Sequence, residues 1–168
     1  MIRICLHGAE STGKSTLAAR LAARFGCRWV PEYGREYCET RGIELAMADL
    51  LAIAAGQDAA MRAAAAEQPR LLILDTDPLM SAAWAEMLFG EVPGELLAYP
   101  KAEHYLLFAP DVPWRADGTR FFGEAGTRAR FAGLARQMVE RAGVSYTLIE
   151  GAWEAREEAA ANAIERLL

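Results

Sequence analysis

The sequence predicts a three-layer α/β fold, in which a five-stranded parallel sheet is covered by helices on both faces. Short apolar runs alternate along the chain with longer helical patterns, as expected when crossover helices join parallel strands. The run Leu71–Leu74 shows no polar alternation, which is typical of a strand buried on both sides. The length of 168 residues fits one domain of ordinary size, so we expect residues 1–168 to form a single domain.

Each element is predicted from its apolar pattern and from the turn-forming residues beside it. The predicted strands are Ile2–His7, Cys27–Pro31, Arg70–Thr76, His104–Ala109 and Ser145–Ile149. The predicted helices are Lys14–Phe25, Ile43–Glu67, Leu79–Phe89, Gly126–Ala142 and Ala152–Leu168. The predicted elements run from residue 2 to the C-terminus, and we therefore expect the domain to be complete.

Composition and charge exclude several classes of protein. The net charge of −5 argues against a dedicated nucleic-acid binder, which would be basic. The chain has no apolar run long enough to span a bilayer and no signal-peptide pattern at its start. Its three cysteines lack metal-type spacing, which favours reduced thiols. We expect a cytoplasmic protein that binds neither membranes nor nucleic acid, with its oligomeric state left open.

A glycine-rich loop follows the first predicted strand. Its sequence, Gly8-Ala9-Glu10-Ser11-Thr12-Gly13-Lys14-Ser15, fits the pattern G-x-x-x-x-G-K-[ST] between a strand and a helix. Such a loop points successive backbone N–H groups at the phosphates of a nucleotide, with the positive end of the helix behind them. It predicts a P-loop NTPase fold that binds ATP and Mg²⁺. The expected ATP contacts are Gly8, Glu10, Ser11, Thr12, Gly13, Lys14, Ser15 and Thr16.

The roles within this loop follow from charge and ligand chemistry. Lys14 is expected to neutralise the β- and γ-phosphates, and the Ser15 hydroxyl to bind Mg²⁺. The loop alone leaves the reaction open, because kinases, motor ATPases and switches all use it. The acceptor of the phosphate has to be inferred from other residues.

Polar residues after the second strand are candidates for binding that acceptor. The carboxyl ends of parallel strands border the ligand crevice in such sheets. Glu32 is nearest the strand end and could accept a hydroxyl proton, while Tyr33 and Arg35 could hold a sugar or a planar ring. The alternative is an exposed, ion-paired helix start.

Two aspartates follow the third strand. Asp75 ends an apolar strand and is the expected Mg²⁺ partner of Ser15. Asp77 precedes Pro78, and we rate helix capping and substrate binding as equal for it.

The segment 110–126 is predicted to be a lid, because it is a long loop between a strand and a helix. Trp114 is a candidate wall of the substrate pocket. Arg120 and Arg128 are candidates for neutralising charge on the transferred phosphate. The alternative for each arginine is a solvated surface charge.

Taken together, these motifs resemble the ribosylnicotinamide kinase domain of the NadR family. The matching residues are the phosphate loop, Glu32-Tyr33-Gly34-Arg35-Glu36, Asp75-Thr76-Asp77, Trp114, Asp117-Gly118, Arg120, Gly123, Arg128 and Phe131. The resemblance implies ATP-dependent phosphorylation of nicotinamide riboside to its mononucleotide, a salvage route to NAD. It implies that Lys14 and Ser15 bind ATP and Mg²⁺, that Glu32 and Asp75 form the acidic catalytic pair, and that Arg120 and Arg128 belong to the lid.

Two features depart from the family pattern. Family members often carry an adenylyltransferase domain and sometimes a DNA-binding module, but this chain has no His-x-Gly-His type motif. We therefore expect neither adenylyltransferase nor repressor activity. Pro31 stands where the family leads us to expect an aromatic residue.

Two rival functions stay open. One is a kinase for another nucleoside or deoxynucleoside, with the same fold and a different acceptor. The other is a P-loop ATPase or nucleotide-sensing module that has no small-molecule acceptor. In the preferred interpretation the partner is a small-molecule nucleoside.

Overall fold

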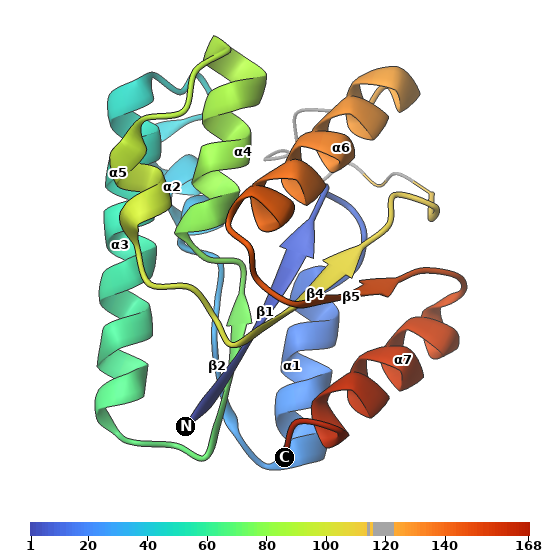
Figure 1. The fold of residues 1–168 in the computed structure, drawn as a ribbon. Helices are drawn as coiled ribbons and strands as arrows, with labels where there is room; N and C mark the ends of the chain where they lie inside the picture. Colours follow the sequence, from blue (N-terminus) through green and yellow to red (C-terminus); the bar gives the residue numbers. More distant parts are fainter. Residues whose placement is uncertain (114, 116–122) are drawn as a thin grey trace.

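A five-stranded parallel sheet forms the centre of the protein (Figure 1). The structure is a computed structural model that describes residues 1–113, 115 and 123–168. The strand order is β2-β3-β1-β4-β5. The strands are β1 (Ile2–Gly8), β2 (Arg28–Val30), β3 (Leu71–Asp75), β4 (His104–Phe108) and β5 (Tyr146–Ile149). All five predicted strands are confirmed, as is the predicted three-layer α/β fold.

Helices cover both faces of this sheet (Figure 1). The helices of one face are α1 (Lys14–Phe25) and α7 (Trp153–Glu165). The helices of the other side are α2 (Tyr33–Arg41), α3 (Met47–Ala66), α4 (Pro78–Phe89), α5 (Gly94–Ala98) and α6 (Ala125–Arg141). Among these described helices, none combines the length and the apolar character that crossing a lipid bilayer requires.

Strand β3 shows why its apolar run has no polar alternation. Side chains of a strand point alternately to the two faces of the sheet. Leu72 and Leu74 belong to the core under α3, α4 and α6. Leu71 and Ile73 belong to the core under α1 and α7. Because both faces are covered, every position of the strand is buried.

Three local features differ from the sequence prediction. Helix α2 was not predicted, since only Tyr37 and Cys38 of its residues are buried and they show no helical spacing. Helix α5 has five residues, too few to show a period. Helix α3 begins at Met47 rather than at Ile43, because the Asp49 carboxylate accepts a hydrogen bond from the Ala46 N–H (2.7 Å) and so marks the first turn.

We predict that removing a side chain from the centre of the sheet strongly destabilises the protein. Leu72 is fully buried and its strand lies between β2 and β1, so Leu72→Ala leaves a cavity. We expect a loss of about 2–5 kcal/mol in the free energy of unfolding, measured by urea denaturation. The matched control Leu148→Ala removes a side chain that is 43% exposed on the edge strand β5. We expect that control to cost less than about 1 kcal/mol. Equal losses in both variants would contradict this account of the core.

Candidate active site

The loop between β1 and α1 has a backbone that only glycine permits at two positions. Gly8 has a φ of 131°, and a Cβ there would lie 2.6 Å from the Phe108 carbonyl oxygen. Gly13 has a φ of 88°, and a Cβ there would lie 2.5 Å from the indole ring of Trp153. Both values lie in the left-handed region that residues with a side chain rarely adopt. The loop is therefore held in one path by its own glycines and by the neighbours that press on them.

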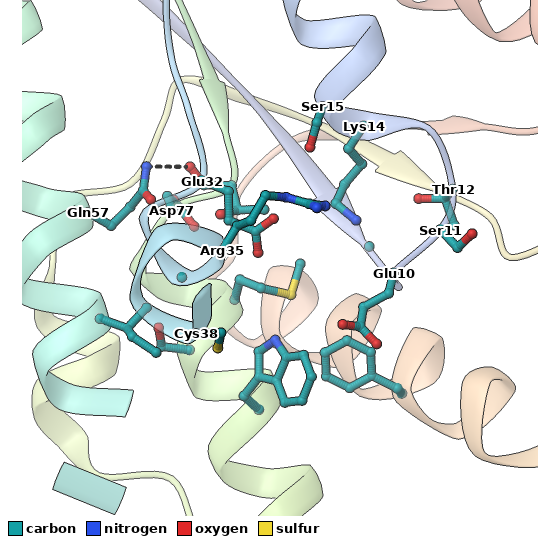
Figure 2. Close-up of a pocket in the computed structure, with 18 of the residues that line it drawn as sticks. Glu10, Ser11, Thr12, Lys14, Ser15, Glu32, Arg35, Cys38, Gln57 and Asp77 are labelled. Carbon is teal, nitrogen blue, oxygen red and sulfur yellow. Dashed lines mark hydrogen bonds between the residues drawn. The ribbon is translucent and has the colours of Figure 1, made fainter. Parts of the chain in front are cut away.

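A cleft opens beside this loop (Figure 2). It lies at the carboxyl end of the sheet, where ligands bind in open α/β folds. Its lining combines the loop with residues of α2, α3, α4, α6 and the turns after β2 and β3. The lining side chains outside the loop include Glu32, Arg35, Cys38, Gln57, Thr76, Asp77, Met80, Trp84 and Phe131.

The loop residues predicted to contact ATP come together at this cleft. All eight line it: Gly8, Glu10, Ser11, Thr12, Gly13, Lys14, Ser15 and Thr16. The Lys14 side chain is 9% exposed, and its ammonium group donates a hydrogen bond to the Ala9 carbonyl of the same loop (2.6 Å). The ammonium group therefore already lies over the loop backbone.

Glu32 lines the cleft, and the charge of the buried Asp75, which is not itself part of that lining, acts on it. The pKa of Glu32 is raised to about 7, chiefly by burial and then by the charge of Asp75, against the lowering effect of Lys14 and Arg35. Burial also raises the pKa of Asp75, while the Ser15 hydroxyl, Lys14 and Arg35 lower it. Two carboxylates in one partly dry site resist double ionisation. One of the pair, Glu32, is thereby suited to exchange a proton near neutral pH.

The residues expected to bind Mg²⁺ fit a magnesium ion. Asp75 is 1% exposed, and its Oδ1 has no hydrogen-bond partner among the described residues. The Ser15 hydroxyl is close enough to lower the pKa of Asp75. Carboxylate and hydroxyl oxygens are the hard ligands that Mg²⁺ prefers. A buried carboxylate oxygen without a partner is costly unless a cation or a donor meets it.

Gln57 of α3 holds together the two turns that carry the acidic residues, and the sequence analysis did not single it out. Its Oε1 accepts a hydrogen bond from the Tyr33 N–H (2.7 Å). Its Nε2 donates to the carbonyl oxygens of Pro31 (3.3 Å) and Thr76 (3.5 Å). Figure 2 shows Gln57 on the side of the cleft opposite Thr12. A single glutamine in an alanine-rich helix gives no sequence signal for this role.

Thr76, between the two aspartates, has a backbone conformation that is unfavourable for its type. Its φ of 68° is left-handed, which a β-branched residue rarely adopts. The Thr76 N–H donates to the Leu6 carbonyl (3.1 Å), and the Thr76 carbonyl accepts from Gln57. These bonds hold the turn that directs Asp75 and Asp77 to one end of the sheet.

Asp77 caps helix α4 and also lines the cleft. Its Oδ1 accepts a hydrogen bond from the Leu79 N–H (3.0 Å), and its Oδ2 accepts one from the Tyr105 hydroxyl. Burial raises the pKa of Asp77 to about 6, against the lowering effect of these two bonds. The capping role that the sequence suggested is confirmed.

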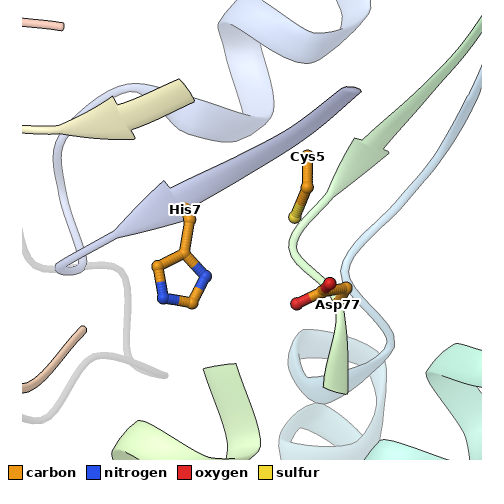
Figure 3. A group of neighbouring side chains, drawn as sticks. All are labelled: Cys5, His7 and Asp77. Atoms are coloured by element: carbon orange, nitrogen blue, oxygen red, sulfur yellow. The ribbon is translucent and has the colours of Figure 1, made fainter. Parts of the chain in front are cut away.

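Cys5 and His7 lie beside Asp77 under the cleft (Figure 3). Their potential metal-ligating atoms lie within 4.8 Å of one another. The His7 Nε2 lies 3.1 Å from the Ala135 carbonyl, and burial lowers the pKa of His7 to about 3. The imidazole is therefore neutral, with Nε2 as the donor. Both Asp77 oxygens already accept hydrogen bonds, from the Leu79 N–H and the Tyr105 hydroxyl. We therefore interpret Cys5, His7 and Asp77 as support for the turn before α4 rather than as a metal site.

Two other predicted site residues, Tyr33 and Arg128, are placed differently. Among the described residues, the lining of the cleft includes neither Tyr33 nor Arg128. The Tyr33 ring packs on Gly56 of α3. Arg128 is 8% exposed and donates to the carbonyl oxygens of Val112 (2.6 Å) and Ser11 (3.1 Å), so it contacts the loop backbone. Trp114 and Arg120 lie outside the described residues, together with residues 116–119, 121 and 122 of the predicted lid.

Two aromatic rings that were not paired from the sequence form an apolar wall of the cleft. The rings of Trp84 from α4 and Phe131 from α6 have centroids 4.8 Å apart, and both line the cleft. No sequence pattern indicates that these two positions meet, because 46 residues lie between them along the chain. Only the packing of α4 against α6 brings them together.

Comparison with known proteins connects the chain to one family and to two curated relatives. The family model described as "AAA domain" matches residues 3–156. The trifunctional NAD biosynthesis/regulator protein NadR of Escherichia coli (strain K12) is 30% identical over 154 residues, which is 88% of this chain and 38% of that protein. The NadR of Salmonella typhimurium is 29% identical over 156 residues, 89% of this chain and 38% of that protein. The chain therefore spans less than half the length of these relatives.

Three solved structures share the fold of this chain. A NadR protein in complex with NR superposes with a TM-score of 0.79 at 23% identity, over 98% of this chain and 49% of that one. A NadR protein in complex with NAD and AMP-PNP gives 0.75 at 21%, again over 98% and 49%. Deoxyadenosine kinase from M. mycoides gives 0.68 at 10%, over 98% and 100%. The resemblance to NadR is confirmed in sequence and in structure.

The raised pKa of Glu32 predicts how stability depends on pH. The folded protein keeps the Glu32 proton up to about pH 7, whereas the unfolded chain releases it near the usual value of 4.5. The free energy of unfolding therefore falls as pH rises from about 4.5 to 7. In urea denaturation, we expect the wild type to lose on the order of 1–2 kcal/mol more than Glu32→Gln between pH 5 and pH 8.

The matched control for this measurement is Glu36→Gln, which changes an exposed glutamate in α2, the helix that begins directly after Glu32. It should follow the pH profile of the wild type. A constant difference between wild type and Glu32→Gln across this range would show that Glu32 ionises as it does in the unfolded chain.

Proposed function

The chain belongs to the AAA domain family, and from that premise we propose that it is an ATP-dependent kinase that phosphorylates the 5′-hydroxyl of nicotinamide riboside, giving nicotinamide mononucleotide. The fold is that of a nucleoside-kinase-like P-loop protein. One observation carries the proposal: a single cleft brings the phosphate loop together with buried carboxylates and an aromatic wall. An ATPase without an acceptor has no use for the acidic and aromatic half of that cleft.

The residues of the cleft support a transfer in which positioning and charge supply most of the acceleration. Lys14 neutralises the β- and γ-phosphates from its place over the loop. Glu32, with its pKa of about 7, accepts the proton of the attacking hydroxyl. Arg35 lines the same cleft and lowers the pKa of both carboxylates, so it stabilises their ionised forms.

Asp75 and Ser15 are the residues that would hold Mg²⁺. When bound there, the ion supplies positive charge against the phosphate oxygens. The partnerless oxygen of Asp75 is the observation in this chain that supports its presence.

The acceptor end of the cleft suits a cationic ring. Nicotinamide riboside carries a pyridinium, which is attracted to aromatic faces and to carboxylates. Trp84 and Phe131 supply the rings, and Glu10 and Glu32 supply carboxylates in the same lining. The presence of NR in a solved NadR complex of the same fold supports this choice of acceptor.

A second candidate is a kinase for another nucleoside. The fold likeness to deoxyadenosine kinase, with a TM-score of 0.68 over 98% of this chain, favours it as the alternative. The two functions share the phosphate loop and differ only in the acceptor, so one assay separates them.

We predict that this assay favours nicotinamide riboside. The purified protein is incubated with Mg–ATP and one of several nucleosides and deoxynucleosides, and the monophosphate is detected by mass spectrometry. Nicotinamide riboside should exceed every neutral nucleoside in kcat/KM by about 10-fold or more, because only it carries the charge that the acidic cleft attracts. A higher value for a neutral deoxynucleoside would favour the second candidate, and ATP hydrolysis indifferent to every nucleoside would exclude both.

A second prediction concerns Lys14. Lys14→Ala should lower kcat about 100-fold or more, because the charge on the β- and γ-phosphates is then no longer neutralised. The matched control is Lys101→Ala, since Lys101 is the only other lysine and donates to the Leu97 carbonyl, away from the cleft. Circular dichroism should show the same fold in both variants. Near-normal turnover by Lys14→Ala would refute the assignment of the loop as the ATP site.

A further inference from the structure

Arg156 of α7 is the largest side chain that the described structure buries completely. Its guanidinium donates hydrogen bonds to the carbonyl oxygens of Gly151 (2.8 Å), Ala109 (3.0 Å) and Thr12 (3.3 Å). It also pairs with the carboxylate of Asp111. One side chain thus links the end of β4, the turn before α7 and the phosphate loop.

Asp111 holds this guanidinium in place. One of its oxygens accepts from Arg156, and the other accepts from the Gly151 N–H (2.7 Å). The Gly151 carbonyl in turn accepts a hydrogen bond from Arg156, so Asp111, Gly151 and Arg156 form a closed ring of hydrogen bonds. The Asp111 side chain is 41% exposed, whereas that of Arg156 is 0% exposed. The aspartate therefore brings the countercharge from the surface to a buried cation.

The backbone carbonyl groups on the outer side of the phosphate loop need hydrogen-bond donors. Where successive N–H groups turn inward to meet a phosphate, the carbonyl groups between them turn outward and need partners of their own. Thr12 is 1% exposed, so water cannot serve its carbonyl. Arg156 supplies that donor from α7, and Arg128 supplies one to the neighbouring Ser11 carbonyl from α6.

Helix α7 meets the loop at a second point as well. The Trp153 ring packs so closely on Gly13 that a Cβ would not fit between them. Trp153 and Arg156 are three residues apart and therefore share one face of the helix. Consecutive loop residues, Thr12 and Gly13, are thus held from outside by one face of α7.

We propose that Arg156 is a positioning residue for nucleotide binding, which acts on the phosphates through the Thr12–Gly13 peptide of the loop. Its charged hydrogen bond to the Thr12 carbonyl fixes that peptide plane and polarises it, so that the Gly13 N–H becomes a stronger donor toward a phosphate. Asp111 orients the guanidinium for this contact. The inference rests on the proposed use of the loop as the ATP site and adds residues outside the cleft to that site.

The alternative is that Arg156 only stabilises the fold. If Arg156 only stabilises the fold, replacing it lowers the melting temperature but leaves the folded protein with its normal affinity for ATP. If Arg156 positions the loop, replacing it weakens ATP binding in protein that is still folded and leaves the nucleoside site largely unchanged. Comparing the change in affinity for ATP with the change in KM for the nucleoside therefore distinguishes a positioning role from a purely stabilising one.

The experiment compares four variants of the full chain at a temperature where each is folded by circular dichroism. Arg156→Met removes the donors, Arg156→Lys keeps a charge without the forked geometry, and Asp111→Asn removes the countercharge. The control Glu157→Gln alters the next residue of α7, which pairs with Arg20 of α1 on the surface. The dissociation constant of Mg–ATP is measured by calorimetry, and KM is measured for ATP and for the nucleoside.

We expect Arg156→Met to raise the dissociation constant of Mg–ATP about 10-fold or more, the effect of losing a charged hydrogen bond. Arg156→Lys should recover part of the affinity, and Asp111→Asn should lose part of it. KM for ATP should rise with the dissociation constant, while KM for the nucleoside stays within about twofold. Glu157→Gln should match the wild type in every constant.

Unchanged ATP affinity in folded Arg156 variants would overturn the proposal, and so would an equal rise in both KM values. If Arg156→Met does not fold, Arg156→Lys and Asp111→Asn decide by the same criteria. A wild-type protein that binds Mg–ATP but does not phosphorylate nicotinamide riboside refutes the proposed function, yet its binding constants still test Arg156. A wild-type protein that does not bind Mg–ATP overturns both.

Discussion

The backbone path of the loop between β1 and α1 is the constraint on which the rest of the structure depends. Two left-handed glycines define that path, and each is pressed by a residue distant in sequence, Phe108 on β4 and Trp153 on α7. The Ser11 and Thr12 carbonyl groups of the loop accept hydrogen bonds from buried arginines of α6 and α7. The loop is local in sequence, but its shape is held by elements from both halves of the chain. This is why a short motif needs a whole domain around it.

The carboxylates at the cleft beside the loop are unfavourable in their ionised forms, and a bound cation would stabilise those forms. Burial raises the pKa of Glu32 and Asp77, which line the cleft, and of the buried Asp75 nearby, so the ionised forms of all three are destabilised. Lys14 and Arg35 oppose this effect on Glu32 and Asp75. A bound cation or cationic ring would oppose it further, because it favours the charged carboxylates. In the free protein, the ionised carboxylates are therefore electrostatically unfavourable at the place where a substrate would bind.

The elements of the fold could be predicted because their signals are local. The five strands are short apolar runs, and α1 begins after the glycine loop and ends before Gly26, which has a left-handed φ of 60°. Helices α2 and α5 escaped prediction, since one buries only two adjacent residues and the other has a single turn. Within the candidate site, the phosphate loop, Glu32, Arg35 and Asp77 line the cleft as predicted, whereas Tyr33 packs on α3 instead.

By itself, the sequence determined the phosphate loop, the parallel α/β order and the carboxylates that end two strands, because each depends on residues close together in the chain. Only the tertiary structure decided that Gln57 joins two turns, that Trp84 meets Phe131, and that Arg156 reaches the Thr12 carbonyl. These contacts join residues that are 24, 47 and 144 positions apart. No local pattern encodes them, since they arise when separate helices pack on a common sheet and buried polar groups must find partners.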